Sequence, residues 1–249
     1  MIKFFRKIRQ QLVKENRLSK YFLYAFGEMV LVVVGILIAL QIDNWNENRK
    51  LEVKTQNYYK QILEDLQKDK TFATQTITKF ELQRKAYQDY IDKFKSSQFT
   101  LTSMYEELLD LNAESYALNF NTSTIESLQN SGEIALIPPH LRNKLLDLKR
   151  MQQKITLDES LDNRAKTGVT ERISMLIGSP DLEKRLEHQE ELKHSLDIEK
   201  NKAKIILGLE GVQDWMDFSE KKSIGQLKEL VKEIETIEEL IIKEIASLS

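Results

Sequence analysis

Cysteine is absent from this chain of 249 residues, and proline and glycine are scarce. The lack of cysteine excludes disulfides, thiolate metal ligands and cysteine nucleophiles, and it leaves the redox compartment undecided. The 3 prolines and 8 glycines fall far below the usual shares of about 5% and about 7%. Neither residue type occurs between Gly35 and Gly132. So few helix breakers predict an all-α fold made of long helices.

Recognisable catalytic patterns are also missing. The chain has no phosphate-binding loop, no dinucleotide-binding glycine pattern and no hydrolase nucleophile elbow. Of the three histidines, His188 and His194 are six residues apart, unlike the i,i+4 pair of a zinc helix, and His140 stands alone. Carboxylates recur at helical spacing beside lysines, which is typical of solvated helix faces. We therefore expect no catalytic, cofactor-binding or metal-ligating residue and no enzymatic activity.

The net charge of −2 is unevenly distributed. Residues 1–20 contain seven lysines and arginines against a single acid, Glu15. The remainder is mildly acidic, which argues against nucleic-acid binding.

A long hydrophobic run is present from Tyr21 to Ile42, with one formal charge before Asp43. A helix of about 22 residues spans ~33 Å, enough for the ~30 Å hydrocarbon layer of a bilayer. Tyr21 and Tyr24 lie at one end of the run and Trp45 at the other, as interfacial aromatic residues do. A buried soluble helix normally keeps a polar face, and a cleaved signal has a shorter apolar region and a small-residue cleavage site. We therefore expect an uncleaved membrane anchor over residues 21–44.

The basic bias predicts the orientation of this anchor. Seven basic residues precede the run and about four follow within a comparable distance. Residues 1–20 should therefore form a basic cytoplasmic segment, and residues 45–249 a periplasmic helical domain on an inner-membrane anchor. Ile2, Phe5, Ile8 and Leu12 share one face of residues 2–13, so this segment is either an amphipathic helix on the inner leaflet or a plain positive flank.

Glu28 lies about one turn inside the hydrophobic run. One interpretation is a side chain that snorkels toward the cytoplasmic headgroups. The other is a helix–helix interface, in which Gly35 and Ala39 allow close backbone approach and Glu28 bonds across the pair. The candidate interface face comprises Ala25, Glu28, Val32, Gly35 and Ala39, at steps of three and four residues.

Long helical stripes follow Trp45 and predict an elongated helical bundle. One seam, close to a heptad pattern, comprises Tyr59, Ile62, Leu66, Ala73, Ile77, Phe80, Tyr87, Ile91 and Phe94. The first helix should end near Ser96, and a Ser103/Glu106 capping box should open the next. Another helix is expected over residues 140–176, ending at Gly178, and Gly208 and Gly211 suggest a bend. The terminal stripe comprises Leu227, Val231, Ile234, Ile241, Ile245 and Leu248.

The irregular stretch NTSTIESLQNSGEIALI, which begins at Asn121, is the best candidate for a functional element. Ser123 and Glu126 form a second capping-box pattern, and Gly132 is expected to stop the short helix in a left-handed conformation. One interpretation is a structural corner containing Asn121, Ser123, Glu126 and Gly132. The other is a loop that contacts a partner or ligand, since binding residues favour loops held by a rigid scaffold.

The opening MIKFFRKIRQQLVKENRLSKYFLYAFGEMVLVVVGILIALQIDNWNE resembles a family of uncharacterised single-span envelope proteins of Bacteroidota, as does NTSTIESLQNSGEIALIPPHLRNKLL. The first match covers about 50 residues and the second about 25. The resemblance implies an inner-membrane protein with a periplasmic helical domain, and it implies no activity, cofactor or catalytic residue.

Two functions of different classes follow from this organisation. The favoured one is a non-enzymatic, membrane-anchored scaffold that docks an envelope protein, with homo-oligomerisation left open. The alternative is a periplasmic sensory domain that binds a small ligand and signals through a partner. An enzyme of unfamiliar type is a third, weaker hypothesis. Purification in mild detergent would distinguish the scaffold from the sensory domain: a co-purifying protein favours the scaffold, and a co-purifying small molecule favours the sensory domain.

Overall fold

The computed structural model describes residues 18–179, 181–196 and 198–247, and the regular elements among these residues are all helices, with no strand. The chain divides into two units, Met1–Asn57 and Tyr58–Ser249, and helix α2 contributes to both. The elements in order are α2 (Leu18–Lys93), α3 (Leu101–Asp110), α4 (Ser123–Asn130), the 3-10 helix η1 (Glu133–Leu136), α5 (Pro139–Ile177), α6 (Leu182–Arg185), α7 (Glu190–Leu196) and α8 (Ile198–Ser247). The expected all-α class is therefore confirmed.

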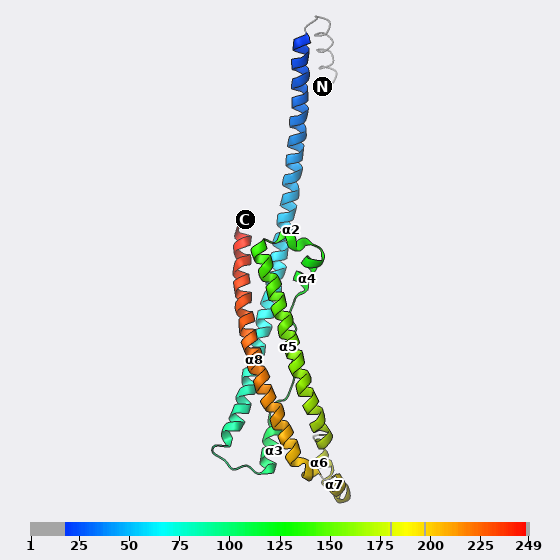
Figure 1. Cartoon of the computed structure of the whole chain (residues 1–249), viewed down its shortest axis with the longest axis vertical. Coiled ribbons are helices and arrows are strands. Elements are labelled where there is room, and N and C mark those ends of the chain that lie inside the picture. The colour runs from blue at the N-terminus through cyan, green and yellow to red at the C-terminus, as the bar shows by residue number, and fades with distance from the viewer. Residues whose placement is uncertain (1–17, 180, 197, 248–249) are drawn as a thin grey trace. The chain divides into compact units, whose positions relative to one another are not determined.

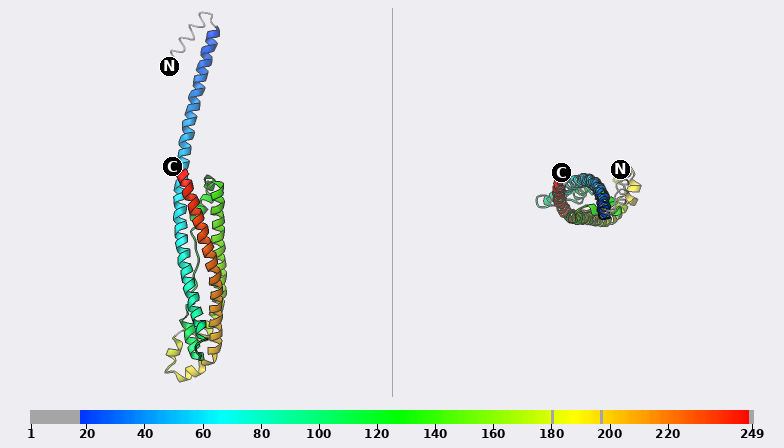
Figure 2. Two further views of the ribbon diagram at one scale, coloured as in Figure 1. Left: turned by 90° about the vertical axis from the view of Figure 1, so that its left-hand side faces the viewer. Right: turned by 90° about the horizontal axis from the view of Figure 1, so that it is seen from above.

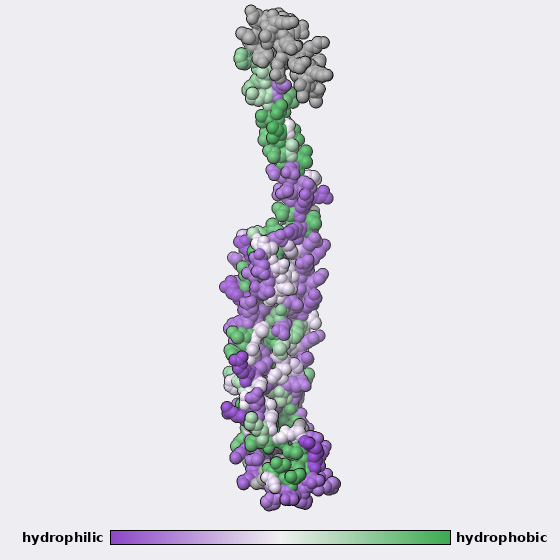
Figure 3. All heavy atoms as spheres, turned by 90° about the vertical axis from the view of Figure 1, so that its right-hand side faces the viewer, coloured by the Kyte–Doolittle hydropathy of each residue, from purple (hydrophilic) through white to green (hydrophobic). Residues whose placement is uncertain are grey.

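The described part of the first unit is the beginning of α2. By length and composition, α2 is the one helix among the described residues that qualifies to cross a membrane, and none of its most apolar stretch is buried. Figure 3 shows this run as a band of hydrophobic surface. All five residues of the candidate interface face lie in this uninterrupted helix. The expected amphipathic segment with Ile2 and Phe5 lies outside the described residues.

The second unit is a bundle of three long helices: α2 from Tyr58 onward, α5 and α8, which lie side by side in Figures 1 and 2. The direction of each helix follows from its cross-links. Lys144 pairs with Glu233 and Ser223 bonds Glu159, so α8 is antiparallel to α5. Lys70 of α2 pairs with Glu238 and Arg84 with Asp217, so α2 is also antiparallel to α8 and therefore parallel to α5.

The expected seam of α2 faces the interior of this bundle within one chain. Buried members are Tyr59, Ile62, Leu66, Ala73, Phe80 and Tyr87. Ile77 and Ile91 are partly buried against the core, and Phe94 at the end is exposed. The C-terminal stripe is also buried at Leu227, Ile234 and Ile241, while Leu248 lies outside the described residues.

The core consists of two apolar clusters separated by polar residues. The larger cluster extends along α2 from Tyr59 to Phe80 and includes the facing parts of α5 and α8. The smaller one contains Tyr87, Tyr90 and residues of α3, α5 and α8. Between the two clusters, α5 and α8 bury Glu159, Lys166 and Glu220.

An extended segment, residues 112–122, connects α3 at one end of the bundle to α4 at the other (Figure 1). Helix side chains donate hydrogen bonds to the backbone carbonyls of this segment, which has no backbone partner from a helix or a sheet at these positions. Gln213 donates to the Asn112 carbonyl at 3.4 Å, Lys166 to the Ala113 carbonyl at 3.2 Å and Asn163 to the Tyr116 carbonyl at 3.0 Å. The segment is thereby fixed along the bundle without regular secondary structure.

Both expected capping boxes were placed wrongly. Helix α3 begins three residues earlier than expected: Thr100 is its N-cap, and Thr100 and Ser103 bond each other's backbone amides reciprocally. At α4 the N-cap is Thr122, which makes no side-chain cap bond, and its hydroxyl donates to the Glu126 carboxylate at 3.0 Å. Ser123 is therefore the first helical residue and not the cap.

The helix ends were predicted with mixed success. Helix α5 ends at Ile177, and Gly178 follows with φ of 73°, close to the expected stop. In contrast, α8 continues as helix through Gly208 and Gly211, so these glycines do not interrupt it. Gly208 serves packing instead, because a Cβ atom there would lie 2.7 Å from Ile173 Cγ1 of α5.

Candidate functional site

Asp69 of α2 is the centre of a buried hydrogen-bond network that fixes Asn121, the first residue of the corner. The side chain occupies a core position of the seam and is 1% exposed. Its Oδ1 accepts hydrogen bonds from the backbone and side-chain nitrogens of Asn121, each at 2.8 Å. Its Oδ2 accepts one from Gln152 Nε2 of α5 at 2.7 Å. Burial raises the pKa of Asp69, and the bonds from Asn121 and Gln152 oppose that rise.

The other corner residues lie on α4 and at its end. Glu126 accepts from Thr122 and pairs with Lys149 of α5 at 3.3 Å, and these contacts lower its pKa. Gly132 has φ of 75°, in the left-handed region, and its amide donates to the Gln129 carbonyl at 3.2 Å. Buried Leu128 packs into the larger apolar cluster, so the corner is tied to the bundle by polar and apolar contacts.

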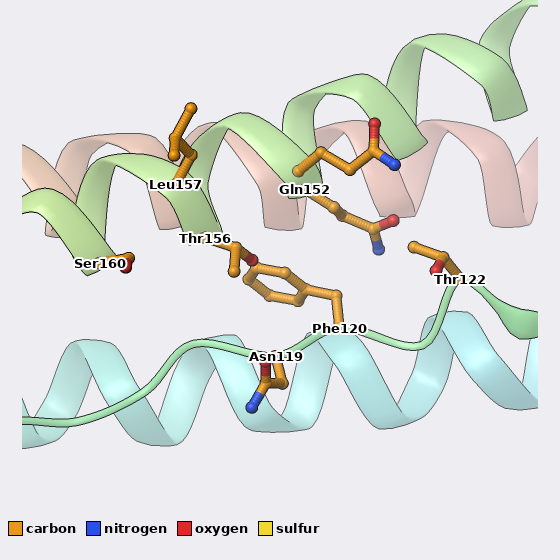
Figure 4. Close-up of a pocket in the computed structure, with 8 residues that line it drawn as sticks. Asn119, Phe120, Thr122, Gln152, Thr156, Leu157 and Ser160 are labelled. Atoms are coloured by element: carbon orange, nitrogen blue, oxygen red, sulfur yellow. The ribbon is translucent and has the colours of Figure 1, made fainter.

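A surface pocket of about 410 Å³ lies beside this contact, between the extended segment and α5. That volume falls in the ~300–1,000 Å³ range of small-molecule sites. In Figure 4, Phe120 reaches from the segment toward Thr156 and Gln152 of α5. The pocket is lined by three amide side chains (Asn119, Gln152, Gln153), three hydroxyl side chains (Thr122, Thr156, Ser160) and two apolar ones (Phe120, Leu157).

The polar residues between the apolar clusters form a second group, which we call the polar layer: Glu159, Lys166, Glu220 and Ser223. Ser223 of α8 donates to Glu159 of α5 at 2.7 Å. A cavity of about 10 Å³ adjoins Glu159, Lys166 and Glu220, enough for on the order of one water molecule. These contacts join both helices and the extended segment.

Burial shifts the pKa values of the titratable groups in this layer in the direction that favours their neutral forms. Burial raises the pKa of Glu220 to about 8, with Lys166 opposing the rise and Glu159 adding to it. Burial also raises the pKa of Glu159, and the hydrogen bond from Ser223 opposes that rise. Burial lowers the pKa of Lys166, against the attraction of Glu220 and Glu159. Among the described residues, no group of acids and histidines is arranged to hold a metal ion.

An exposed apolar patch lies on the outside of α8. It consists of Trp215 (40% exposed) and Phe218 (62%), and we call it the Trp215 surface. The Trp215 and Phe218 rings are 6.1 Å apart between centroids. Trp215 Nε1 donates to the Asp162 carbonyl at 3.3 Å, which places its ring beside α5. Large apolar side chains in contact with solvent indicate a binding surface more often when they are clustered than when they are scattered.

Of the corner residues, Asn121 bonds Asp69 and Glu126 pairs with Lys149, whereas Ser123 and Gly132 begin and follow α4. The five interface-face residues lie in the other unit. The sequence analysis missed Asp69, Gln152 and Glu220. A signal was present: each fills a gap in a regular three-and-four spacing of core positions. A polar residue in such a gap is expected to be buried because of its position. A search for apolar stripes alone does not find it.

Comparison with protein families gives one match. The model described as "Family of unknown function (DUF6090)" matches residues 28–170, more than half of the chain. Searches of the curated proteins and of the solved structures found no match. The matched range contains most of the apolar run, the α2 seam, the extended segment and the corner. The chain therefore belongs to DUF6090, a family of unknown function.

Proposed function

We propose that this protein is a non-enzymatic, membrane-anchored docking protein. The apolar run of α2 holds it in the inner membrane, residues 1–20 lie in the cytoplasm, and the helical bundle lies in the periplasm. The partner is another envelope protein that presents an amphipathic helix to the bundle. The observation that carries this proposal is the Trp215 surface, since Trp-centred apolar patches dominate the energetics of many protein interfaces.

The organisation of the chain supports this proposal in two further ways. The most apolar stretch of α2 contains no buried residue and has the length of a membrane span. The buried acids and Lys166 make contacts that hold the bundle and its extended segment together, which is a structural use of those groups. A rigid three-helix body is also a suitable platform for a partner helix.

Reporter fusions test the orientation. A periplasm-active enzyme fused after Ser249 should be active, and a fluorescent protein that matures only in the cytoplasm should stay dark. Alkaline carbonate should leave the full-length protein in the membrane pellet. The reverse pair of reporter results would reject the periplasmic location, and release of the protein by carbonate would reject the anchor.

A matched pair of substitutions tests the docking surface. Phe218→Glu should abolish cross-linking to the partner that co-purifies in mild detergent, because it puts a charge into the apolar patch. Ile242→Glu on the same helix is the control, since Ile242 is 59% exposed and lies outside the patch. Equal cross-linking in both variants would reject the Trp215 surface as the docking site.

A second function, binding of a small ligand by a sensory domain, is favoured by the pocket between the extended segment and α5. The occupant would contact both a helix and the segment that crosses the bundle, so binding would stabilise their contact. Mild-detergent purification separates the two functions: a retained protein favours docking, and a retained small molecule favours sensing.

A further inference from the structure

Lys166 of α5 holds the extended segment through a buried hydrogen bond. Its side chain is 6% exposed, and its Nζ donates to the Ala113 carbonyl at 3.2 Å. Within the described residues Lys166 makes no ion pair, so a neutral carbonyl is the acceptor for its buried ammonium. A buried charge without a counter-charge is unfavourable. Lys166 would therefore gain free energy from an ionised carboxylate within its reach.

Glu220 of α8 is a carboxyl group within that reach. It is 5% exposed, and it makes no hydrogen bond or ion pair in the part of the chain that the structure describes. Lys166 and Glu220 line the same cavity of about 10 Å³, so the long lysine side chain has space to turn toward the carboxyl group. Burial dominates both pKa values. Against it, Lys166 lowers the pKa of Glu220 and Glu220 raises that of Lys166, so the two charges interact.

The other charged groups around Glu220 already have partners. Those that face it or its cavity are Arg84 of α2, Glu159 and Asp162 of α5, Asp217 of α8 and Glu114 of the extended segment. Arg84 pairs with Asp217 at 2.9 Å, and Asp162 pairs with Lys222. Glu159 accepts a hydrogen bond from Ser223 at 2.7 Å, and Glu114 accepts one from Tyr116 at 3.0 Å. Lys166 is therefore the cation that can respond when Glu220 ionises.

Glu220 changes its charge in an accessible pH range. Burial raises the pKa of Glu220 to about 8, so the carboxyl group is neutral below this pH and ionised above it. The neighbouring bonds of the segment do not titrate, because the amides of Gln213 and Asn163 donate to the carbonyls of Asn112 and Tyr116. The bond from Lys166 to Ala113 lies between these two fixed points.

We propose that Lys166 and Glu220 form a proton-controlled latch on residues 113–115 of the extended segment. With Glu220 protonated, Lys166 holds the Ala113 carbonyl. When Glu220 loses its proton to solvent, Lys166 turns to the carboxylate, and the carbonyl of the exposed Ala113 accepts from water instead. Residues 113–115 then become mobile between the bonds at Asn112 and Tyr116. The latch goes beyond the docking function and requires neither the Trp215 surface nor a bound ligand.

Electron paramagnetic resonance of a spin label on Ala113→Cys tests this latch. The full-length chain has no cysteine, so the label is unique, and Ala113 is exposed. Between about pH 6 and about pH 9.5 the immobile component of the spectrum should be lost, with a midpoint near pH 8. A label on Ala117→Cys, exposed on the same segment but beyond Tyr116, should not change. An unchanged spectrum at Ala113, or an equal change at Ala117, overturns the proposal.

Two substitutions should fix the latch in opposite states. In labelled Glu220→Gln, which cannot ionise, the immobile component should persist at both pH values. Lys166→Met, which removes the donor, should lose that component at both. Glu239→Gln, at an exposed position on α8, should follow the wild type. A thermal melt establishes that each variant is folded, and if Lys166→Met is not, Glu220→Gln decides the test alone. A pH response that survives in folded Glu220→Gln overturns the latch.

Discussion

Gly132 shows how one residue fixes the corner between α4 and η1. Its φ of 75° lies in the left-handed region, where a side chain approaches the backbone and costs about 1–2 kcal/mol. A Cβ atom at this position meets nothing within 4 Å, so the cost is one of backbone strain and not of crowding. We expect Gly132→Val to lower the unfolding free energy by about 1–2 kcal/mol, which a thermal melt would detect as a drop of several degrees.

Gly225 is the control for this prediction. It lies in the interior of α8, and a Cβ atom there also meets nothing within 4 Å. Gly225→Ala should therefore raise the unfolding free energy by about 0.5–1 kcal/mol through helix propensity. An unchanged melting temperature in Gly132→Val, with the expected rise in Gly225→Ala, would show that the left-handed conformation does not stabilise the corner.

Glu220 is expected to make stability depend on pH. Because folding raises its pKa from the ordinary 4.5 to about 8, the native state binds more protons than the unfolded state between these values. The free energy of unfolding should therefore fall as the pH rises through this window. The lowered pKa of Lys166 has the opposite effect on the alkaline side, where stability rises with pH.

Glu220→Gln removes this titration while keeping the shape of the side chain. Melting temperatures of this variant and of the wild type should converge near pH 5 and diverge toward pH 8, where the variant should be the more stable. Glu239→Gln, at an exposed position on the same helix, should follow the wild type. Parallel curves for Glu220→Gln and the wild type would mean that Glu220 does not titrate in this range.

At the scale of the element, the contact between α5 and α8 depends on a glycine. A Cβ atom at position 208 would lie 2.7 Å from Ile173 Cγ1, whereas one at Gly211 meets nothing within 4 Å. Overpacking of a well-filled core typically costs about 1–3 kcal/mol. We therefore expect Gly208→Ala to be less stable than Gly211→Ala by about this amount in chemical denaturation, since both gain the same helix propensity.

A double-mutant cycle isolates the cause. If the clash with Ile173 accounts for the loss, Gly208→Ala should cost little in an Ile173→Ala background. Additive losses in the double variant would place the origin elsewhere on the helix.

Elements with a strong apolar period were predictable from sequence, and elements held by side-chain contacts were not. The seam of α2 and the C-terminal stripe follow from spacing alone, and Gly178 marks the end of α5. The Asp69–Asn121–Gln152 contact joins residues 52 and 83 positions apart, so no local pattern reveals it. The capping boxes were misplaced because Thr100 is the N-cap of α3, with Ser103 as its N3 partner, and because α4 begins after Thr122 without any side-chain cap bond.

For the whole molecule, the seam of α2 is used within a single chain, and this leaves the apolar run as the place for self-association. Lipid tails are as apolar as valine or leucine, so burial alone does not drive helix pairing in a bilayer. Close packing and interhelical hydrogen bonds must provide the free energy. Gly35 and Ala39 allow close approach, and Glu28 on the same face supplies a polar group. We therefore expect chains to pair through the face from Ala25 to Ala39.

Single cysteines placed along positions 25–40 of the membrane-embedded protein test this face, and the native chain contributes no background because it has no cysteine. Disulfide yields should peak every three to four residues, at the positions of the face. Gly35→Ile should reduce the yields by blocking backbone approach, whereas Val30→Ile, on the opposite side of the helix, should not. Glu28→Gln should be tolerated, because it keeps a donor and an acceptor and interhelical polar contacts average only about 0.6 kcal/mol. Yields without periodicity, or yields that Gly35→Ile leaves unchanged, would mean that this face is not an interface and that Glu28 extends toward the headgroups instead.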